Sequence, residues 1–442
     1  MSEYSVKSGD TLWSICKNFF KISENTEIRD RVNTVAQRNY LESPNSIFVG
    51  QKLDMRIGRE FYEENSENKL DYKEGEFFAF AGFANEGKGG MVSAKNNYEE
   101  TGGIYSLDCA SRETMDPKLV SKIFKEAPEL IKKMQFDDMT FTNGGYPDSF
   151  DPEKIMELGK DPAHNIRKIQ EMGYTGEGVA VAIIDWILPR HENLGDVNGE
   201  DNTQIRYTEM PNSKSSLEAM HGSSVASLLF GKETGVAPNA NVVYCSASSN
   251  SIEEQDADHI AAFKHILEHN KNNPNNPIRV VSMSAPVNTK ESEALVEQLN
   301  QSGTWVLSSG EFFENFGYLQ RNDPMGDPND FENYSIAHEG SGNPDVLFIN
   351  SGNRTVAESV DSTNYRHDSR ASASWSIPVI AGLYTLACQA DSSMTPERFV
   401  ELARETAQEI EINNNFEGSD NYGQTQIAKI IDAETLIKKI IE

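Results

Sequence analysis

The stretch GEGVAVAIIDW, residues 176–186, contains the feature that decides the fold. Two glycines lead into the apolar run 179–184, which ends at a single carboxylate, Asp185. A continuous apolar run predicts a strand covered on both faces, as strands of parallel sheets are. Open α/β sheets form their sites at the carboxyl ends of such strands. Asp185 is therefore a candidate functional residue.

Strand and helix patterns alternate after this point. MHGSSVASLLFG, residues 220–231, predicts a helix that opens at His221, with Gly222 allowing a neighbouring backbone to approach. The patterns that follow are a strand from Asn241, a helix over 252–270, a strand over 278–287, a helix over 291–303 and a strand over 304–310. This alternation predicts the α/β class with a doubly wound parallel sheet.

The stretch SASWSIPVIAG, residues 372–382, predicts the start of an apolar helix with Pro378 inside its first turn. Taken alone, this pattern is typical of a helix cap. A serine at such a start also has its own backbone N–H free to stabilise an oxyanion. Ser374 is therefore either a nucleophile or only a polar residue at the start of a helix, and the pattern alone does not decide between them.

Four motifs in order resemble the subtilase family: VAIID (181–185), HGSSVAS (221–227), GVAPNA (235–240) and SASWSIPVIAG (372–382). Asp, His, Ser is the chain order of a subtilisin triad. The resemblance implies a serine endopeptidase in which Ser374 is the nucleophile, His221 transfers its proton, and Asp185 orients the imidazole. It implies no organic cofactor. Calcium is common in that family, but no loop here has a convincing carboxylate spacing, so no metal ligand is predicted.

Two departures from the family pattern concern the nucleophile and the substrate. Ser372-Ala373 stands where the family has Gly-Thr before the serine. The resemblance assigns substrate binding to Ser284, Ala285, Pro286 and Gly310, and the family has glycine in place of Pro286. Proline has no N–H, so one strand-like hydrogen bond to a substrate is expected to be lost.

The third departure concerns the oxyanion. Where the family keeps an asparagine whose side chain helps to hold that charge, this sequence has Glu311. A carboxylate cannot donate a hydrogen bond, and losing one such donor costs about 10²–10³ in rate. A buried, protonated Glu311 would donate, or Asn315 would take the place after a local insertion. The remaining alternative is a weakened or dead site.

The first 56 residues have a pattern of their own. YSVKSGDTLWSICKNFF predicts a strand, a break at Gly9 and a helix capped by Asp10 or Thr11. A second helix with Val32, Val35 and Ala36 inward follows, and then a second strand after a turn at Gly50. The predicted order is βααβ.

These residues resemble a LysM domain, through Tyr4, Val6, 9–12, Ile15, Asn39 and 49–53. The resemblance implies binding of polymers that contain N-acetylglucosamine, meaning peptidoglycan or chitin. The glycan-binding residues that it implies are Gly9, Asp10, Thr11, Leu12, Ser46 and Ile47. The alternative is a module that serves only for docking inside a larger assembly.

The sequence predicts four segments: a LysM domain over 1–56, an acidic linker over 57–76, an unassigned segment over 77–160, and a peptidase domain over 161–442. The linker is acidic and poor in aliphatic residues. The unassigned segment contains a glycine cluster without a phosphate-loop lysine and an amphipathic pattern broken at Pro128. It would be an inhibitory or folding segment, or an extension on the enzyme surface.

The net charge of −29 disfavours binding to nucleic acid or to anionic membranes. Residues 1–55 hold seven basic and seven acidic side chains, so the whole excess lies after them. Four widely spaced cysteines predict reduced thiols, and no apolar stretch is long enough to span a membrane. Without a visible signal peptide, we expect synthesis in a bacterial cytoplasm. Delivery to a cell wall, spore coat, phage or injection particle is compatible with this.

Three functions are compatible with these patterns. The first is a serine endopeptidase that acts on protein or peptide substrates and is carried to its target by the LysM domain. The second is a pseudoprotease that keeps the fold as a binding or signalling scaffold. The third is a structural protein of a wall or spore. Asp185, His221 and Ser374 favour the first, whereas Glu311 and Pro286 favour the second.

Overall fold

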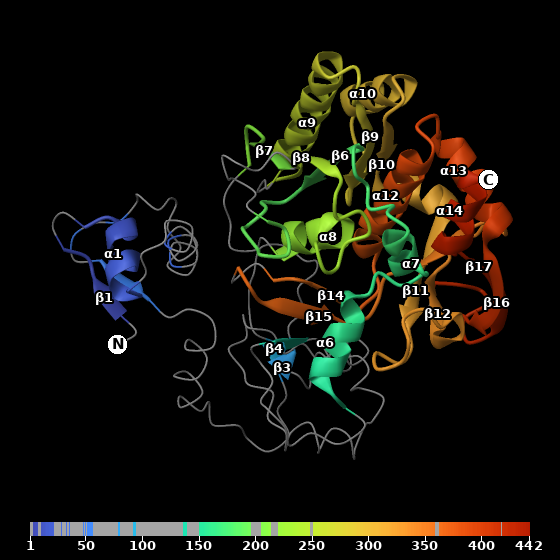
Figure 1. Cartoon of the computed structure of the whole chain (residues 1–442), viewed down its shortest axis with the longest axis horizontal. Helices are drawn as coiled ribbons and strands as arrows, with labels where there is room; N and C mark the ends of the chain where they lie inside the picture. Colours follow the sequence, from blue (N-terminus) through green and yellow to red (C-terminus); the bar gives the residue numbers. More distant parts are fainter. Residues whose placement is uncertain are drawn as a thin grey trace. The chain divides into compact units, whose positions relative to one another are not determined.

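The structure, drawn in Figure 1, is a computed structural model. The chain divides into two compact units. One unit comprises Met1–Lys154 with Glu358–Asp368, and the other comprises Ile155–Ala357 with Ser369–Glu442. The described residues are 3–7, 10–21, 28, 32, 35, 47, 49, 51–55, 78–79, 92–93, 136–138, 150–195, 205–213, 220–247, 251–358, 362–416 and 418–442.

The first unit begins with a small domain of two antiparallel strands and a helix. β1 (Glu3–Ser5) pairs with β2 (Lys52–Asp54), so Tyr4 lies opposite Leu53. Between them, α1 (Leu12–Phe19) starts at Thr11, which shares a capping box with Ser14. The domain has its own apolar core, formed by Val6, Leu12, Ile15, Cys16, Ile28, Val32, Val35, Leu53 and Met55.

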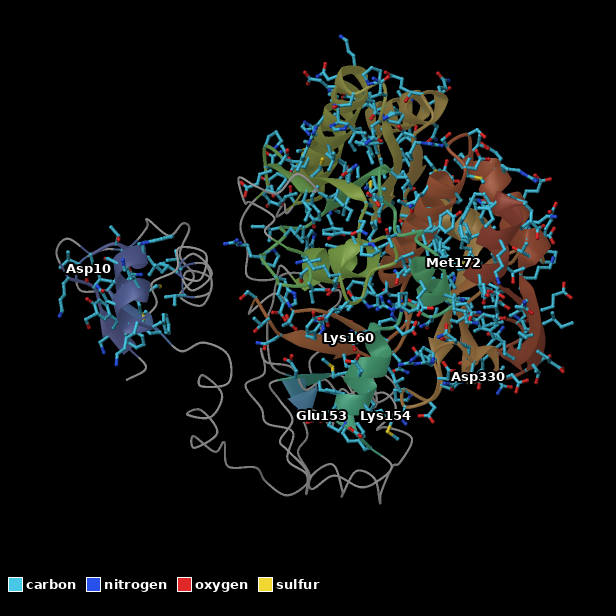
Figure 2. The ribbon with its side chains drawn as sticks, in the orientation of Figure 1. Asp10, Glu153, Lys154, Lys160, Met172 and Asp330 are labelled. Carbon is cyan, nitrogen blue, oxygen red and sulfur yellow. The ribbon has the colours of Figure 1, made fainter. Side chains whose placement is uncertain are left out.

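Thr11, and not Asp10, caps α1. The carboxylate of Asp10, labelled in Figure 2, accepts hydrogen bonds from the Lys7 N–H (2.7 Å) and the Tyr4 hydroxyl (2.9 Å). Val32 and Val35 are the described residues of the predicted second helix, and both are helical and buried. Gly9, Asn39, Ser46, Gly50 and the linker 57–76 lie outside the described residues, as does most of 77–149.

Among the described residues, the rest of the first unit contains two pairs of short strands. β3 (Phe78–Ala79) pairs with β4 (Val92–Ser93), and β5 (Phe136–Asp137) pairs with β15 (Tyr365–Asp368), both antiparallel. On β15, Arg366 is buried with carboxylate oxygens of Asp368 at 3.4 Å and Glu358 at 4.0 Å. These acidic neighbours make it possible to bury the cation.

The second unit is built on a five-stranded parallel sheet in the order β10-β9-β6-β8-β7. Its strands are β6 (Ala180–Asp185), β7 (Ile205–Glu209), β8 (Asn241–Ser246), β9 (Ile278–Met283) and β10 (Trp305–Leu307). All six residues of β6 are buried. The predicted parallel sheet is thus confirmed, although the strand expected over 304–310 ends at Leu307.

Alternate residues of β6 separate two helical layers. Val181 and Ile183 pack with α8 (Met220–Phe230) and α12 (Ala373–Ala390), whereas Ala182 and Ile184 pack with α9 (Ile252–Asn272) and α10 (Lys290–Gln301). Figure 1 shows these helix pairs on the two faces of the sheet. The sheet is therefore doubly wound, as predicted.

A second sheet, which the sequence patterns did not predict, has the order β12-β11-β13-β17-β16. Its strands are β11 (Phe316–Arg321), β12 (Tyr334–His338), β13 (Leu347–Asn350), β16 (Gln408–Asn413) and β17 (Thr425–Ile430). The other elements are α6 (Pro152–Lys160), α7 (Ile166–Glu171), α11 (Ser309–Asn315), η2 (Phe331–Asn333), β14 (Arg354–Ala357), α13 (Pro396–Thr406) and α14 (Ala433–Ile441). No described helix is long and apolar enough to cross a membrane.

Candidate active site

Asp185 is the last residue of β6, at the carboxyl edge of the parallel sheet. Its Oδ1 accepts hydrogen bonds from the backbone N–H of Trp186 and from Nδ1 of His221, both at 2.7 Å. The two side chains are almost fully buried, with 3% of Asp185 and 10% of His221 exposed. Because a carboxylate can only accept, Nδ1 carries the proton, and Nε2 keeps the lone pair that a general base needs.

Gly222 lets the start of α8 lie against the loop that follows β6. A Cβ atom at this position would stand 2.6 Å from the carbonyl oxygens of both Trp186 and Ile187, and 2.7 Å from the Tyr244 hydroxyl. No side chain larger than hydrogen fits there without a shift of the backbone. The predicted close approach at Gly222 is thus confirmed, and it brings His221 to the end of β6.

Ser374 is the second residue of α12 and is half-buried. α12 packs against α8, and the ring of Trp375 lies 5.3 Å from the ring of His221, which brings the start of α12 beside the imidazole. Within the described part of the chain, neither the hydroxyl nor the backbone N–H of Ser374 forms a hydrogen bond. Both groups are therefore available at a helix N-terminus, where anions are favoured.

Pro378 lies in the second turn of α12 and not in the first, because the helix already begins at Ala373. In a regular helix the N–H of residue 378 would bond to the carbonyl of Ser374, but proline has no N–H. That carbonyl instead accepts a hydrogen bond from the Ser284 hydroxyl at 3.4 Å. The proline thereby frees a backbone acceptor next to the candidate nucleophile.

The predicted substrate-binding residues follow β9 and β10. Ser284 contacts the backbone of Ser374, and the carbonyl of Ala285 accepts the Ser309 N–H at 3.2 Å. Pro286 and Gly310 are exposed. The structure thus brings the segment 284–285 next to the starts of both α12 and α11.

Glu311 lies in α11, and its carboxylate accepts a hydrogen bond from the Trp305 indole N–H at 3.3 Å. Glu311 also lines a cavity of about 670 Å³ with residues next to the amino ends of β6, β9 and β10, including Val179 and Trp305. Asp185 is at the opposite end of β6. The structure shows no hydrogen bond from the Glu311 side chain to any of the described triad residues.

Asn315, the alternative oxyanion donor, is the last residue of α11. Its amide oxygen accepts a hydrogen bond from Nη2 of Arg404, on α13, at 3.0 Å. The structure therefore brings together Asp185, His221, Ser374 and Ser284, and it brings neither Glu311 nor Asn315 into a hydrogen bond with them. The oxyanion role of Glu311 or Asn315 stays a prediction.

Comparison with known proteins identifies the family. Residues 176–424, more than half of the chain, match the subtilase family profile, and residues 4–56 match the LysM domain profile. The chain belongs to the subtilase family. This subtilase has no match among curated proteins.

Two solved structures are similar to this subtilase. One is the prenylagaramide maturation protease PagA, at 15% identity and a TM-score of 0.39, covering 62% of this chain and 98% of that one. The other is a cold adapted subtilisin-like serine proteinase, at 18% identity and a TM-score of 0.38, covering 58% and 90%.

Three aromatic residues of the subtilase site were missed by the sequence analysis. The rings of Trp186 and Trp375 both lie beside His221. Tyr244 donates a hydrogen bond to the Trp186 carbonyl at 2.5 Å. Burial, helped by the negative charge of Asp185, raises the pKa of Tyr244 well above its usual value, so the hydroxyl stays a donor. One signal was visible in the sequence, because each tryptophan directly follows a predicted triad residue.

The implied glycan-binding residues of the LysM domain have unequal exposure. Thr11 is exposed and Asp10 is half-buried. Leu12 is only 1% exposed and belongs to the core, against which Ile47 also packs. Leu12 therefore has no side-chain surface to offer to a glycan, whereas Thr11 has. Gly9 and Ser46 lie outside the described residues.

Proposed function

We propose that the protein is a serine endopeptidase that uses Asp185, His221 and Ser374. The observation that carries this proposal is the 2.7 Å hydrogen bond between Asp185 and His221, buried at the carboxyl edge of the sheet, with the start of α12 beside the imidazole. Membership of the subtilase family supports peptide-bond hydrolysis as the reaction.

The first half of the reaction forms an acyl-enzyme. Nε2 of His221 removes the proton of the Ser374 hydroxyl while Oγ attacks the substrate carbonyl carbon. The oxyanion develops where the Ser374 N–H and the N-terminal end of α12 favour negative charge. The imidazolium, held by Asp185, then gives its proton to the leaving amine as the peptide bond breaks.

The second half repeats this chemistry with water. His221 takes a proton from a water molecule that attacks the acyl carbon, and returns the proton to Ser374 Oγ as the acid product leaves. In the structure, the Ser374 hydroxyl forms no hydrogen bond to the imidazole of His221. Such contacts are often long without substrate and shorten in the substrate complex.

The substrate chain would run along the segment that contains Ser284 and Ala285. This segment is fixed by its hydrogen bonds to Ser374 and Ser309, so it can present backbone groups to an extended peptide. Exposed Pro286 removes one N–H from that edge. The LysM domain would bring this peptidase to a polymer that contains N-acetylglucosamine, a role supported by the match of residues 4–56.

A fluorophosphonate probe tests the proposed nucleophile. Ser374 Oγ would form a bond to phosphorus while fluoride leaves, so the wild-type protein is expected to become labelled and to hydrolyse a denatured protein substrate. Ser374→Ala is expected to lose both properties and to remain folded, since Ser374 makes no side-chain hydrogen bond among the described residues. Equal labelling of wild type and Ser374→Ala would remove Ser374 from the mechanism.

One observation favours a pseudoprotease as the second candidate. The carboxylate of Glu311 accepts a hydrogen bond from Trp305 and the amide oxygen of Asn315 accepts one from Arg404, and neither side chain forms a hydrogen bond with Ser374. A folded wild-type protein that neither becomes labelled nor cleaves any tested substrate would support this candidate over the endopeptidase.

A further inference from the structure

The His221 imidazole lies between two indole rings. The ring centroids of Trp186 and His221 are 5.6 Å apart with an interplanar angle of 47°, and those of Trp375 and His221 are 5.3 Å apart at 33°. Trp186 directly follows Asp185, and Trp375 directly follows Ser374. The two candidate partners of His221 thus each supply an aromatic ring from the next residue along the chain.

The two tryptophans are held in different ways, Trp375 through its buried ring and Trp186 through its backbone. Trp375 is 2% exposed and belongs to the main hydrophobic core. The backbone of Trp186 is held on both sides, because its N–H donates to Asp185 and its carbonyl accepts from Tyr244. A ring packed in the core, as that of Trp375 is, cannot move aside when the imidazole turns, and the half-buried ring of Trp186 lies beside the same imidazole from a fixed backbone.

The same rings have an electrostatic effect during the reaction. When His221 takes the Ser374 proton it becomes a cation, and tryptophan is the aromatic ring that attracts cations most strongly at centroid distances up to about 6 Å. His221 is largely removed from water, which strengthens this attraction. Asp185 contacts one nitrogen of the imidazole, Nδ1. This single hydrogen bond does not by itself stop the ring from rotating, so other groups have to limit the rotation.

We propose that Trp186 and Trp375 are positioning residues that hold the His221 imidazole toward Ser374 and stabilise its protonated form. This inference rests on the proposed function for its role in the reaction. The geometric part, restriction of the imidazole, concerns the resting protein and can be measured without any substrate.

Steady-state kinetics test the catalytic part. Trp375→Leu and Trp186→Leu are each expected to lower kcat about tenfold, the loss of one cation–π contact in a desolvated site, with KM unchanged. Trp375→Phe and Trp186→Phe keep a ring and are expected to recover part of the loss. Trp305→Leu is the control for loss of a buried indole, because Trp305 is 4% exposed and packs on Phe316, Tyr384 and Phe399, away from His221.

Proton NMR in the Ser374→Ala background tests the geometric part independently of activity. The downfield resonance of the His221 Nδ1–H that bonds to Asp185 is expected to be sharp with both indoles present. Adding Trp375→Leu or Trp186→Leu should broaden it through exchange with water, whereas Trp305→Leu should not. Should Trp375→Leu fail to fold, Trp375→Phe and the half-buried Trp186 still provide the comparison.

The outcomes separate the two proposals. Lower kcat in both leucine variants together with a broadened resonance supports the positioning role. Unchanged kcat in both, or a resonance that stays as sharp as in the background protein, overturns it. A wild type without activity, whose resonance nevertheless broadens in the leucine variants, would overturn the endopeptidase and retain the indole restriction of His221.

Discussion

His164 is a fully buried histidine outside the active site, and both of its ring nitrogens have partners. Nδ1 donates to the Ile431 carbonyl at 2.8 Å, and Nε2 accepts the Asn350 N–H at 2.7 Å. Because Nε2 must keep its lone pair, the ring has to stay neutral. Burial is the main cause that lowers the pKa of His164 to about 4.

This histidine predicts acid sensitivity of the fold. Its pKa in the unfolded chain is about 6.5, so the unfolded state binds the proton first as the pH falls. Its contribution to stability is therefore complete above about pH 6.5 and is lost between about 6.5 and 4, by about 3 kcal/mol in total. Urea unfolding at several pH values checks this. His164→Gln should show a shallower pH dependence, and an equal slope in both proteins would contradict the assignment.

A second residue-scale prediction concerns Asp185. In Asp185→Asn the amide can donate to Nδ1 of His221, which favours the tautomer with the proton on Nε2 and removes the base. We expect kcat to fall about 10⁴-fold with the fold retained, the loss that a mis-set histidine tautomer causes in a serine protease. Peptidase kinetics together with a thermal unfolding control measure this. A folded Asp185→Asn variant with wild-type kcat would show that Asp185 does not set the tautomer.

Glu311 allows a third test at this scale. Its carboxylate bonds to the Trp305 indole and lines a cavity at the amino end of the sheet, so Glu311→Gln, which keeps an acceptor oxygen, is expected to leave kcat unchanged. If a protonated Glu311 instead donates to the oxyanion, glutamine would donate at every pH, and activity would extend toward alkaline pH. The pH profile of kcat for both proteins distinguishes these results.

At the scale of elements, the position of α8 depends on Gly222. In Gly222→Ala the new Cβ would meet carbonyl oxygens at 2.6 Å, so the start of the helix must move away from the loop after β6. Displacing His221 by about 1 Å is expected to lower kcat at least 10²-fold, and overpacking to lower the free energy of unfolding by about 1–3 kcal/mol. Kinetics and urea unfolding report the two effects, and a variant that keeps full activity would contradict the close packing.

Elements also differ in how far they could be predicted. The parallel strands were visible because they are buried on both faces, as the continuous apolar run of β6 shows. β16 has the sequence QEIEIN, in which exposed residues alternate with half-buried or buried ones. The second sheet brings together β13 and β17 from distant parts of the chain. Local patterns contain no information about such pairing.

The candidate active site likewise has features that could be predicted from the sequence and features that could not. The order of motifs was sufficient to place Asp185 and His221 together. The direction of Glu311 was not predictable, because it depends on α11 beginning at Ser309, directly after a strand that ends at Leu307. A strand that continued to 310, as the sequence pattern suggested, would have presented the Glu311 side chain differently. The residue at which α11 begins thus decides the direction in which the Glu311 side chain points.

At the scale of the whole molecule, the small N-terminal domain and the peptidase have separate cores. Among the described residues, the N-terminal core contains residues between 6 and 55, and the main core begins at Ile166. The two parts also differ in charge, since residues 1–55 are balanced and the rest holds the net −29. Removing one part therefore takes none of the described side chains from the core of the other.

This separation predicts the result of deleting residues 1–56. The shortened protein is expected to cleave a soluble peptide at the wild-type rate, because Asp185, His221 and Ser374 all lie in the second unit, as does the hydrogen bond between Asp185 and His221. It is expected to stop sedimenting with insoluble peptidoglycan or chitin, and soluble chitooligosaccharides should release the full-length protein from both. Ser374→Ala in the full-length chain is the matched control, since it should bind polymer without cleaving peptide. A shortened protein that still sediments would locate glycan binding outside the LysM domain. Loss of peptidase activity in a folded shortened protein would instead show that the two parts depend on each other.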